Sequence, residues 1–409
     1  MHGHGIKHVE ETGPARISPA VQYGLLGVGV VGLLIFLFGA FTGSDAQKYN
    51  AWNGMLVSAS FFWFLAMGAA GFLAIQYVVG AKWFVVVKRL PESIASFAFR
   101  GGFVFPILIA LLAVTTLYSG ARPGADYPYE GTVKAMWLSA NVQTIKMIVY
   151  TLILSAITYM LVSVSRSGVK GSAAELRTRR EKVSIFFLIV YTFVFSLWGW
   201  DILMSLEPKW FSTMWGVYCF SGGFVSALSM MMLMSFWMRS QFPGYLAEKR
   251  QLYDMGTYVM GFATFFVYIG FSQFMLIWYA NIPDETFFYI KRYDNMWLVY
   301  TIAIPVLKWL VPFFVLMPPK LRTSIAAQTI CAVAILGGQI IDLWWVVGPV
   351  DAEQAATYMF PTIVNIATFL GVGGVFGWSV TSYLASAASI VPTEDPDLLS
   401  SINGEYLHA

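Results

Sequence analysis

The chain carries little charge, and its hydrophobic interior has no histidine and no clustered cysteine. Only 11% of its 409 residues are Asp, Glu, Lys or Arg, whereas a typical soluble protein has about 25%. All four histidines lie in the polar tails: His2, His4, His8 and His408. No membrane helix therefore offers an imidazole as an axial ligand for a haem. The two cysteines, Cys219 and Cys331, stand alone in apolar segments, which excludes a CxxC metal site or an iron–sulfur cluster held by this chain.

Apolar residues dominate what is present. They make up 58% of the chain, and the mean hydropathy is +0.66. A run of about 20 apolar residues is long enough to cross a bilayer as a helix. The sequence contains ten such runs, at approximately residues 20–41, 52–79, 99–118, 140–163, 183–205, 213–238, 256–280, 294–316, 323–347 and 358–384. We therefore expect an all-α integral membrane protein with about ten transmembrane helices and no inserted soluble domain.

The basic residues are unevenly divided between the loops. The N-terminal tail and the loops after predicted helices 2, 4, 6 and 8 hold most of the 25 Lys and Arg residues. Because short basic loops stay in the cytoplasm, both termini are predicted to be cytoplasmic. Residues 80–97 mix basic and apolar side chains, which predicts an interfacial stretch on the basic side. The acidic tail after Pro392 is predicted to face a partner or to be loosely ordered.

Two predicted helices end on the same pattern. Asp201 stands seven residues before Pro208, and Asp342 stands seven residues before Pro349. The repetition predicts a duplicated unit in which helices 2–5 correspond to helices 6–9. An offset of four helices preserves orientation, so the halves are expected to be parallel four-helix bundles related by an axis normal to the membrane. Helices 1 and 10 then flank the two bundles.

This scheme divides the chain into six consecutive segments. They are a cytoplasmic N-terminal tail (1–19), helix 1 with its loop (20–51), the first four-helix bundle (52–210), the second four-helix bundle (211–349), a loop with helix 10 (350–385) and a cytoplasmic C-terminal tail (386–409). Glycine-rich runs at 221–223 and 371–374 fall inside predicted membrane helices, where such runs allow close helix contact rather than phosphate binding.

Each predicted bundle contains one lysine and one carboxylate at membrane depth. The expected pairs are Lys146 with Asp201 and Lys308 with Asp342, because an isolated charge at this depth costs several kcal/mol. Lys146 and Asp201 are expected at similar depths in the membrane, whereas Lys308, near the middle of its helix, is expected to lie deeper than Asp342. Two interpretations stay open. The pairs either lock the packing of the bundles, or they serve as a proton relay or as acid/base groups beside a quinol.

Other polar residues extend these candidate paths. Gln143 precedes Lys146 by three residues and Gln339 precedes Asp342 by three, so each lies on the same helix face as its charged neighbour. Gln273 lies on predicted helix 7. Glu207, at the predicted outer surface, is a candidate to receive protons or is simply solvated.

Two longer motifs resemble a known family. Residues 200–216 (WDILMSLEPKWFSTMWG) and residues 271–286 (FSQFMLIWYANIPDET), followed by 289–292 (YIKR), are similar to motifs of one type of membrane subunit. That type is the F-type membrane subunit of bacterial alternative complex III, within the superfamily of polysulfide/nitrite-reductase-type membrane subunits. The resemblance covers nearly all of the chain from the first predicted helix to the tenth.

The resemblance implies a place in a quinol:electron-acceptor oxidoreductase of the bacterial inner membrane. It implies as partners an iron–sulfur subunit, multihaem and monohaem cytochrome c subunits, a C-type sister membrane subunit and small membrane subunits. Haem c and iron–sulfur clusters would sit in those partners, with no cofactor bound by this chain except possible menaquinone. In the family the sister subunit uses a membrane histidine to oxidise menaquinol. This chain has no such histidine, so the resemblance implies a proton-translocation path and a quinone-associated pocket here.

Two alternatives belong to other functional classes. Parallel repeats with ion pairs near the membrane midplane also suit a stand-alone secondary transporter. The pairs would alternatively hold together a purely structural membrane scaffold. Co-purification with haem proteins separates the respiratory role from the transporter, and replacement of the two aspartates by asparagine separates it from the scaffold.

Overall fold

The structure is a computed structural model that describes residues 16–121, 132–169, 171–241, 249–293, 295–348, 359–387 and 389–403. All regular secondary structure in these ranges is helical. Ten helical stretches within them are long and apolar enough to cross a membrane. The predicted all-α, multi-pass membrane protein is therefore confirmed. Pro349, the second proline of the repeated pattern, lies outside the described residues.

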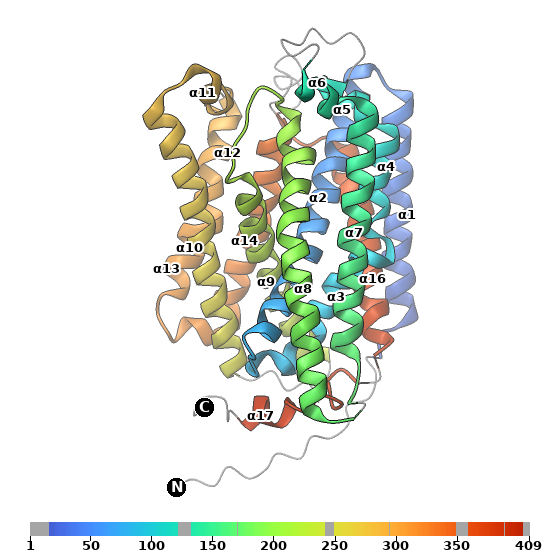
Figure 1. The fold of residues 1–409 in the computed structure, drawn as a ribbon, viewed down its shortest axis with the longest axis vertical. Coiled ribbons are helices and arrows are strands. Elements are labelled where there is room, and N and C mark those ends of the chain that lie inside the picture. Colours follow the sequence, from blue (N-terminus) through green and yellow to red (C-terminus); the bar gives the residue numbers. More distant parts are fainter. Residues whose placement is uncertain are drawn as a thin grey trace.

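The helical elements, in chain order, share one long axis except for the short ones at the ends (Figure 1). They are α1 (Pro19–Thr42), α2 (Asp45–Val78), η1 (Trp83–Val87), α3 (Arg89–Phe97), η2 (Ala98–Gly102), α4 (Val104–Leu112), α5 (Val114–Leu117), η3 (Ser119–Ala121), α6 (Val133–Leu138), α7 (Ala140–Arg166), α8 (Ala173–Trp198), η4 (Gly199–Leu203), η5 (Met204–Leu206), α9 (Trp215–Gln241), α10 (Lys249–Ala280), α11 (Pro283–Ile290), α12 (Asn295–Pro305), η6 (Val306–Leu310), α13 (Val311–Leu316), η7 (Leu321–Thr323), α14 (Ile325–Val347), α16 (Ile363–Ala385) and α17 (Leu398–Asn403).

The long helices group into two bundles and one pair. Helices α2, α3–α4, α7 and α8 pack together, and so do α9, α10, α12–α13 and α14. The two bundles meet mainly where α2 packs along α9, while α1 and α16 form a pair against α2 and α3. This grouping agrees with the predicted bundles of helices 2–5 and 6–9 and with the flanking helices 1 and 10. A parallel repeat relation between the bundles stays a prediction.

The pair α1–α16 is held by contact between glycine backbones. A Cβ atom placed on Gly32 would lie 2.6 Å from Cα of Gly371, and one on Gly374 would lie 2.8 Å from Cα of Gly29. No side chain other than hydrogen fits at such a crossing, which is the small-residue packing common between membrane helices. The glycine run at 371–374 therefore acts as the sequence predicted, by allowing close helix contact.

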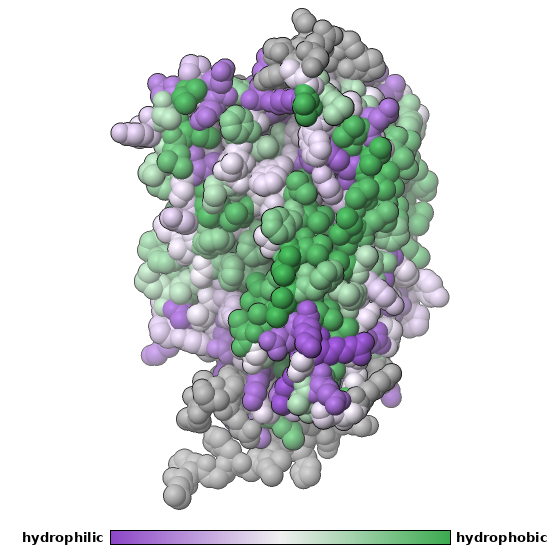
Figure 2. Space-filling view, viewed as in Figure 1, coloured by the Kyte–Doolittle hydropathy of each residue, from purple (hydrophilic) through white to green (hydrophobic). Residues whose placement is uncertain are grey.

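Apolar side chains form a band between two polar ends (Figure 2). Large exposed apolar residues such as Phe38, Phe193 and Tyr268 lie on the surface of α1, α8 and α10. Lipid is the solvent in which such a surface is stable. By contrast, the most apolar window of α2 is entirely buried, because the two bundles and the α1–α16 pair surround it.

Three predicted boundaries are wrong by several residues. The third span begins at Arg89 rather than at residue 99, and residues 89–97 are buried rather than interfacial. The fifth span begins at Ala173, where Ser172 and Glu175 form a capping box, and the second begins after a capping box at Ser44. Capping residues set where a helix begins, and here the helices extend well past the apolar runs from which they were predicted.

The described part of the C-terminal tail is docked on the rest of the chain, which corrects the prediction that it is loosely ordered; that it faces a partner stays a prediction. Ile390, Val391 and Leu398 are buried. The hydroxyl of Ser401 donates to the carbonyl oxygen of Trp83 at 3.1 Å. The tail with α17 thus closes one end of the molecule, which we call the α17 end; the opposite end carries α6 and α11 and is called the α11 end (Figure 1).

Candidate functional site

The first predicted ion pair is formed. Nζ of Lys146, on α7, lies 2.8 Å from Oδ1 of Asp201 in η4. Both residues are buried, with 6% and 4% of their surface exposed. The predicted pairing is confirmed, because the two bundle helices bring the opposite charges together at the same depth.

One charged residue of each ion pair lies in a π-helical turn. The segment η4, which contains Asp201, is a single turn of π-helix. The two other π-helical turns of the described residues are η2, which contains Arg100, and η6, which contains Lys308. A π-turn inserts an extra residue into the helix and redirects the side chains around it, and such turns are frequent at functional sites. In each ion pair, one charged residue (Asp201 or Lys308) therefore lies in such a turn, and its partner (Lys146 or Asp342) lies in regular α-helix.

Asp201 is the centre of a network of donors. The indole N–H of Trp137 donates to Oδ1 at 2.8 Å, and the hydroxyl of Tyr150 donates to Oδ2 at 2.9 Å. The side-chain amide of Gln143 donates to the backbone carbonyl oxygen of Asp201. Nζ of Lys146 also lies 4.3 Å from the centre of the Trp137 ring, a cation–π distance. Both carboxylate oxygens of this buried group thus accept hydrogen bonds.

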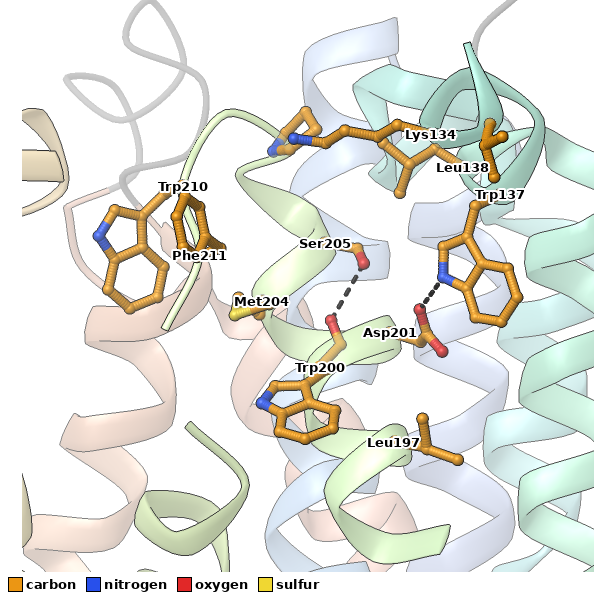
Figure 3. Close-up of a pocket in the computed structure, with 12 residues that line it drawn as sticks. Lys134, Trp137, Leu138, Leu197, Trp200, Asp201, Met204, Ser205, Trp210 and Phe211 are labelled. Carbon is orange, nitrogen blue, oxygen red and sulfur yellow. Dashed lines mark hydrogen bonds between the residues drawn. The ribbon is translucent and has the colours of Figure 1, made fainter. Parts of the chain in front are cut away.

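A cleft of about 500 Å³ reaches Asp201 from the α11 end. Figure 3 shows Trp137 and Asp201 on one side of it, with Trp210 and Phe211 on the other. Trp200 completes its aromatic wall. The indole N–H groups of Trp200 and Trp210 are buried and have no hydrogen-bond acceptor in the described part of the chain. The volume is within the range of small-molecule sites, about 300–1,000 Å³.

The second predicted pair is formed as well. Nζ of Lys308, in η6, lies 2.8 Å from Oδ2 of Asp342 on α14 and 2.7 Å from Oε1 of Gln339. The hydroxyl of Tyr218 donates to Oδ1 of Asp342. Nζ of Lys308 also lies 3.3 Å from the centre of the Phe266 ring. The difference in depth between Lys308 and Asp342 does not prevent pairing, because the π-turn and the long lysine side chain span it.

Two glycines make room for this pair. A Cβ atom on Gly338 would lie 2.6 Å from Cγ of Lys308, and one on Gly222 would lie 2.9 Å from Oε1 of Gln339. Lys308 has no exposed surface, and Asp342 has 2%. The second pair is therefore the more enclosed of the two.

The remaining predicted site residues lie apart from the carboxylate pairs. The side-chain amide of Gln273 donates to the hydroxyl of Tyr289 at 3.3 Å, and its oxygen is buried without a partner among the described residues. Glu207 accepts from Nζ of Lys291 at 2.8 Å, so it is paired rather than only solvated. Gln143 and Gln339, in contrast, contact the first and second pair respectively.

Sequence reasoning missed the role of Arg292, which it treated as a loop residue. Arg292 is buried and donates to the carbonyl oxygens of Trp345 at 3.0 Å and Val346 at 3.1 Å. It thereby binds the C-terminal end of α14 one turn after Asp342. Burial lowers the pKa of Arg292 to about 10. The available signal in the sequence was the position of Arg292 in the YIKR motif. In the structure, the preceding Lys291 pairs with Glu207, and Arg292 is buried.

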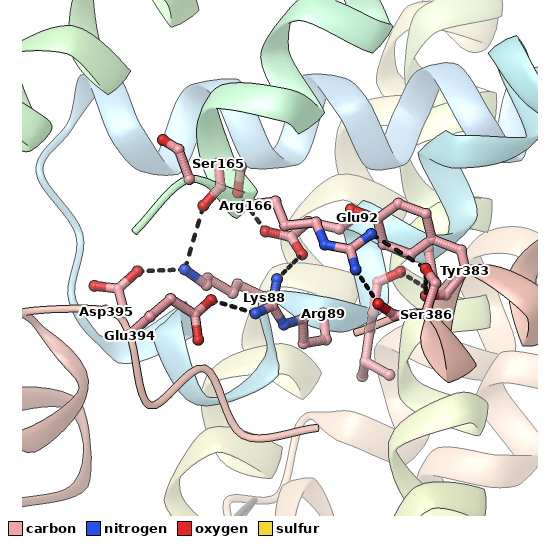
Figure 4. Close-up of polar contacts among 12 residues, drawn as sticks. Lys88, Arg89, Glu92, Ser165, Arg166, Tyr383, Ser386, Glu394 and Asp395 are labelled. Carbon is pink, nitrogen blue, oxygen red and sulfur yellow. Dashed lines mark hydrogen bonds and ion pairs between the residues drawn. The ribbon is translucent and has the colours of Figure 1, made fainter. Parts of the chain in front are cut away.

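A buried cluster of charges at the α17 end was also missed (Figure 4). Nζ of Lys88 lies 2.5 Å from Oδ2 of Asp395, which also accepts from Arg180 at 2.8 Å. Arg89 donates to Glu92 at 2.8 Å and also pairs with Glu394. The cluster ties the C-terminal tail to α3 and α8. Glu92, a lone acid in an otherwise basic and apolar stretch, was the available signal.

Comparison with protein families and with curated proteins identifies no relative of this chain. No protein-family profile matches it, and no curated protein is significantly similar to it. Within the described residues, no group of three or more His, Cys, Asp or Glu side chains is placed to hold a metal ion. The two ion pairs and the cleft beside the first are therefore the features of this chain that bear most directly on its function.

Proposed function

We propose that this chain is a membrane subunit of a quinol:electron-acceptor oxidoreductase of the alternative complex III type. Within it, the chain provides a proton-translocation path and a quinone-associated pocket. One observation carries the proposal: Asp201, which is buried and paired with Lys146, forms part of the wall of an aromatic cleft of about 500 Å³. A carboxylate at membrane depth that is reached by a cleft is a functional group by default.

The chemistry assigned to the first pair is proton transfer. Asp201 accepts and releases the proton, and Lys146 stabilises the carboxylate after release. Trp137 and Tyr150 hold the carboxylate in place through one hydrogen bond to each oxygen. Because Asp201 forms part of the cleft wall, a released proton has a short route to the α11 end.

The cleft suits the head group of a quinone. Its wall is mostly apolar and aromatic, which matches a flat ring, and Trp200 and Trp210 carry indole N–H groups without acceptors. A bound quinol supplies two electrons and two protons on oxidation. In this chain, the aromatic wall positions the ring and excludes water, and Asp201 is the group able to take a proton at this depth. The electrons have to leave through partner subunits.

The second pair is proposed as the inner section of the same path. Lys308, Asp342 and Gln339 form a continuous set of hydrogen bonds in the second bundle, and Ser226 extends it by donating to Gln339 at 3.3 Å. Gln273 and Glu207 remain candidates nearer the α11 end. Gln273 has an amide oxygen free of partners among the described residues, and Glu207 is the carboxylate next along the chain from Asp201.

The proposed setting is the bacterial inner membrane, with both termini in the cytoplasm. Ten spans return the chain to the side on which it started, and the basic loops lie at the α17 end, where the cytoplasm is expected. The proposed partners are the iron–sulfur subunit, the cytochrome c subunits, the C-type sister subunit and the small membrane subunits. The α11 end would then face the subunits that carry the clusters and haems.

The decisive experiment measures quinol oxidation and proton release together in the purified assembly carrying Asp201→Asn. We expect electron transfer to continue while proton release falls. Asp45→Asn is the matched control, because Asp45 is an exposed carboxylate at the same end whose only described ion-pair partner is Lys48, at 3.5 Å. Loss of both electron transfer and proton release in an assembled complex would instead assign Asp201 a direct role in quinol oxidation.

Two other results would replace the proposal. Unchanged electron transfer and unchanged proton release in both Asp201→Asn and Asp342→Asn would make the pairs purely structural. Purification of the chain without any haem protein, together with substrate uptake into vesicles, would make it a stand-alone transporter.

A further inference from the structure

Two arginines at the α17 end share one aromatic ring. The guanidinium carbon of Arg100 lies 5.2 Å from the centre of the Tyr383 ring, and that of Arg166 lies 5.1 Å from it. Arg100 also donates to the hydroxyl of Ser382 at 2.9 Å, and Arg166 to the hydroxyl of Ser386 at 3.2 Å. Three spans thus meet here, because Arg100 is in η2, Arg166 ends α7, and Ser382 and Tyr383 are on α16, with Ser386 directly after it. Figure 4 shows Arg166 beside Tyr383 and Ser386.

The carboxylates of the adjacent charge cluster all pair with basic residues other than Arg100 and Arg166. Its ion pairs are Lys88 and Arg180 with Asp395, Arg89 with Glu92 and Glu394, and Arg177 with Asp397. Four basic side chains and four carboxylates therefore balance. Arg100 and Arg166 are left with hydroxyl, carbonyl and ring contacts, and neither has a carboxylate partner in the described ranges.

The two unneutralised charges lie beside a surface that suits acyl chains. Phe99 precedes Arg100 and packs edge-on against Tyr159 of α7, with 5.3 Å between ring centres. Tyr159 is 59% exposed and lies two helical turns before Arg166. Both arginines are partly exposed, so an outside group can reach them. The hydroxyl proton of buried Tyr383 also has no acceptor among the described residues.

We propose that Arg100, Arg166 and Tyr383 bind the phosphate of an anionic phospholipid from the leaflet at the α17 end. Guanidinium groups match phosphate oxygens through paired N–H donors, and basic pockets between membrane helices on the cytoplasmic side bind such head groups. The Phe99–Tyr159 pair supports the acyl chain. A lipid, rather than free phosphate, is the occupant because the charges adjoin an exposed apolar surface.

The test is a titration of the purified full chain with cardiolipin, followed by native mass spectrometry. The double variant Arg100→Gln/Arg166→Gln is expected to bind cardiolipin about 30-fold more weakly. Arg179→Gln is the matched control, because Arg179 is an exposed arginine at the same end, away from the Tyr383 ring. The control is expected to bind as the wild type does.

Further probes separate the possible sources of the phosphate. Phosphatidylcholine is expected to bind more weakly than cardiolipin, and inorganic phosphate is expected not to displace it. Equal binding of the two lipids, displacement by inorganic phosphate, or unchanged affinity in the double variant would each overturn the proposal. If the double variant does not fold, the single variants Arg100→Gln and Arg166→Gln carry the test, each with an expected loss of about fivefold. Unchanged affinity in both would overturn it equally.

Discussion

Trp137 donates its indole N–H to Oδ1 of Asp201 at 2.8 Å, which joins a short helix above the spans to the end of a membrane helix. The same oxygen accepts from Lys146. Trp137 is also part of the cleft wall. Because Trp137 both holds the Asp201 carboxylate and borders the cleft, it controls the position of that carboxylate relative to a molecule bound in the cleft. The first ion pair is therefore held in part by a short helix, α6, none of whose residues is buried.

Trp137→Phe tests this control. Phenylalanine keeps an aromatic ring near Lys146 but removes the hydrogen bond to Asp201, a change worth about 1 kcal/mol. We expect normal assembly and proton release slowed by about fivefold. Proton release is measured in the purified assembly during quinol oxidation. Trp278→Phe is the control, because Trp278 is an exposed tryptophan on α10 at the same end. Equal rates in both variants would show that the bond to Asp201 has no functional role.

The second pair predicts an asymmetry between single and double substitutions. Asp342→Asn leaves the fully buried Lys308 without a counter-charge, which typically destabilises a protein by about 3–5 kcal/mol. Lys308→Met combined with Asp342→Asn removes both charges and is expected to recover most of that loss. Unfolding of the purified chain in detergent, followed by circular dichroism, measures both. A double variant as unstable as the single one would show that Lys308 is stabilised by Gln339 and Phe266 rather than by Asp342.

The pairs themselves were predictable because a lone charge at membrane depth is too costly to leave unpaired. The groups that surround them were not. Tyr150 and Tyr218 each donate to one aspartate, but they lie on non-corresponding helices of the two bundles. Which face of a helix meets a neighbour depends on helix rotation and on the π-turns. Sequence spacing does not encode either of these.

The charge cluster at the α17 end could not be predicted from the sequence, for a different reason. Lys88 and Asp395 are separated by 307 positions in the chain, and no local pattern connects them. The overall plan of ten spans followed from hydropathy alone, since each span needs its own apolar run. The docking of the tail depended on a long-range ion pair between two segments that each look like solvated loops.

Two adjacent glycines on α14 give a matched pair of variants for the second site. A Cβ atom on Gly338 would lie 2.6 Å from Cγ of Lys308, whereas nothing lies within 4 Å of one on Gly337. Gly338→Ala is therefore expected to destabilise the chain by about 1–3 kcal/mol, the usual cost of overpacking. Gly337→Ala is expected to be neutral or stabilising, because alanine favours helix more than glycine. Thermal unfolding of the two variants in one detergent compares them. Equal stability would mean that Lys308 moves aside without cost.

Docking of the C-terminal tail is expected to depend on pH through Asp395. Burial alone would raise the pKa of this carboxyl, but Lys88 and Arg180 together hold it below its usual 3.8. A carboxyl with a lowered pKa in the folded state contributes stability that is complete above the unfolded value and is lost as pH falls through the folded one. The tail should therefore stay docked from neutral pH to about pH 4 and loosen only below it. Hydrogen exchange of the backbone amides in 396–403 measures this.

Asp395→Asn removes the same charge at every pH and leaves Lys88 and Arg180 buried without their shared carboxylate. The tail is then expected to exchange rapidly even at neutral pH, because a broken buried pair costs about 3–5 kcal/mol. Asp397→Asn is the control in the same segment. Its partner Arg177 has 52% of its side chain exposed, and such a surface pair contributes at most about 1 kcal/mol. Equal exchange in the two variants would contradict the assignment of Asp395 as the residue that fixes the tail, and would place the docking energy in the apolar contacts of Val391 and Leu398 instead.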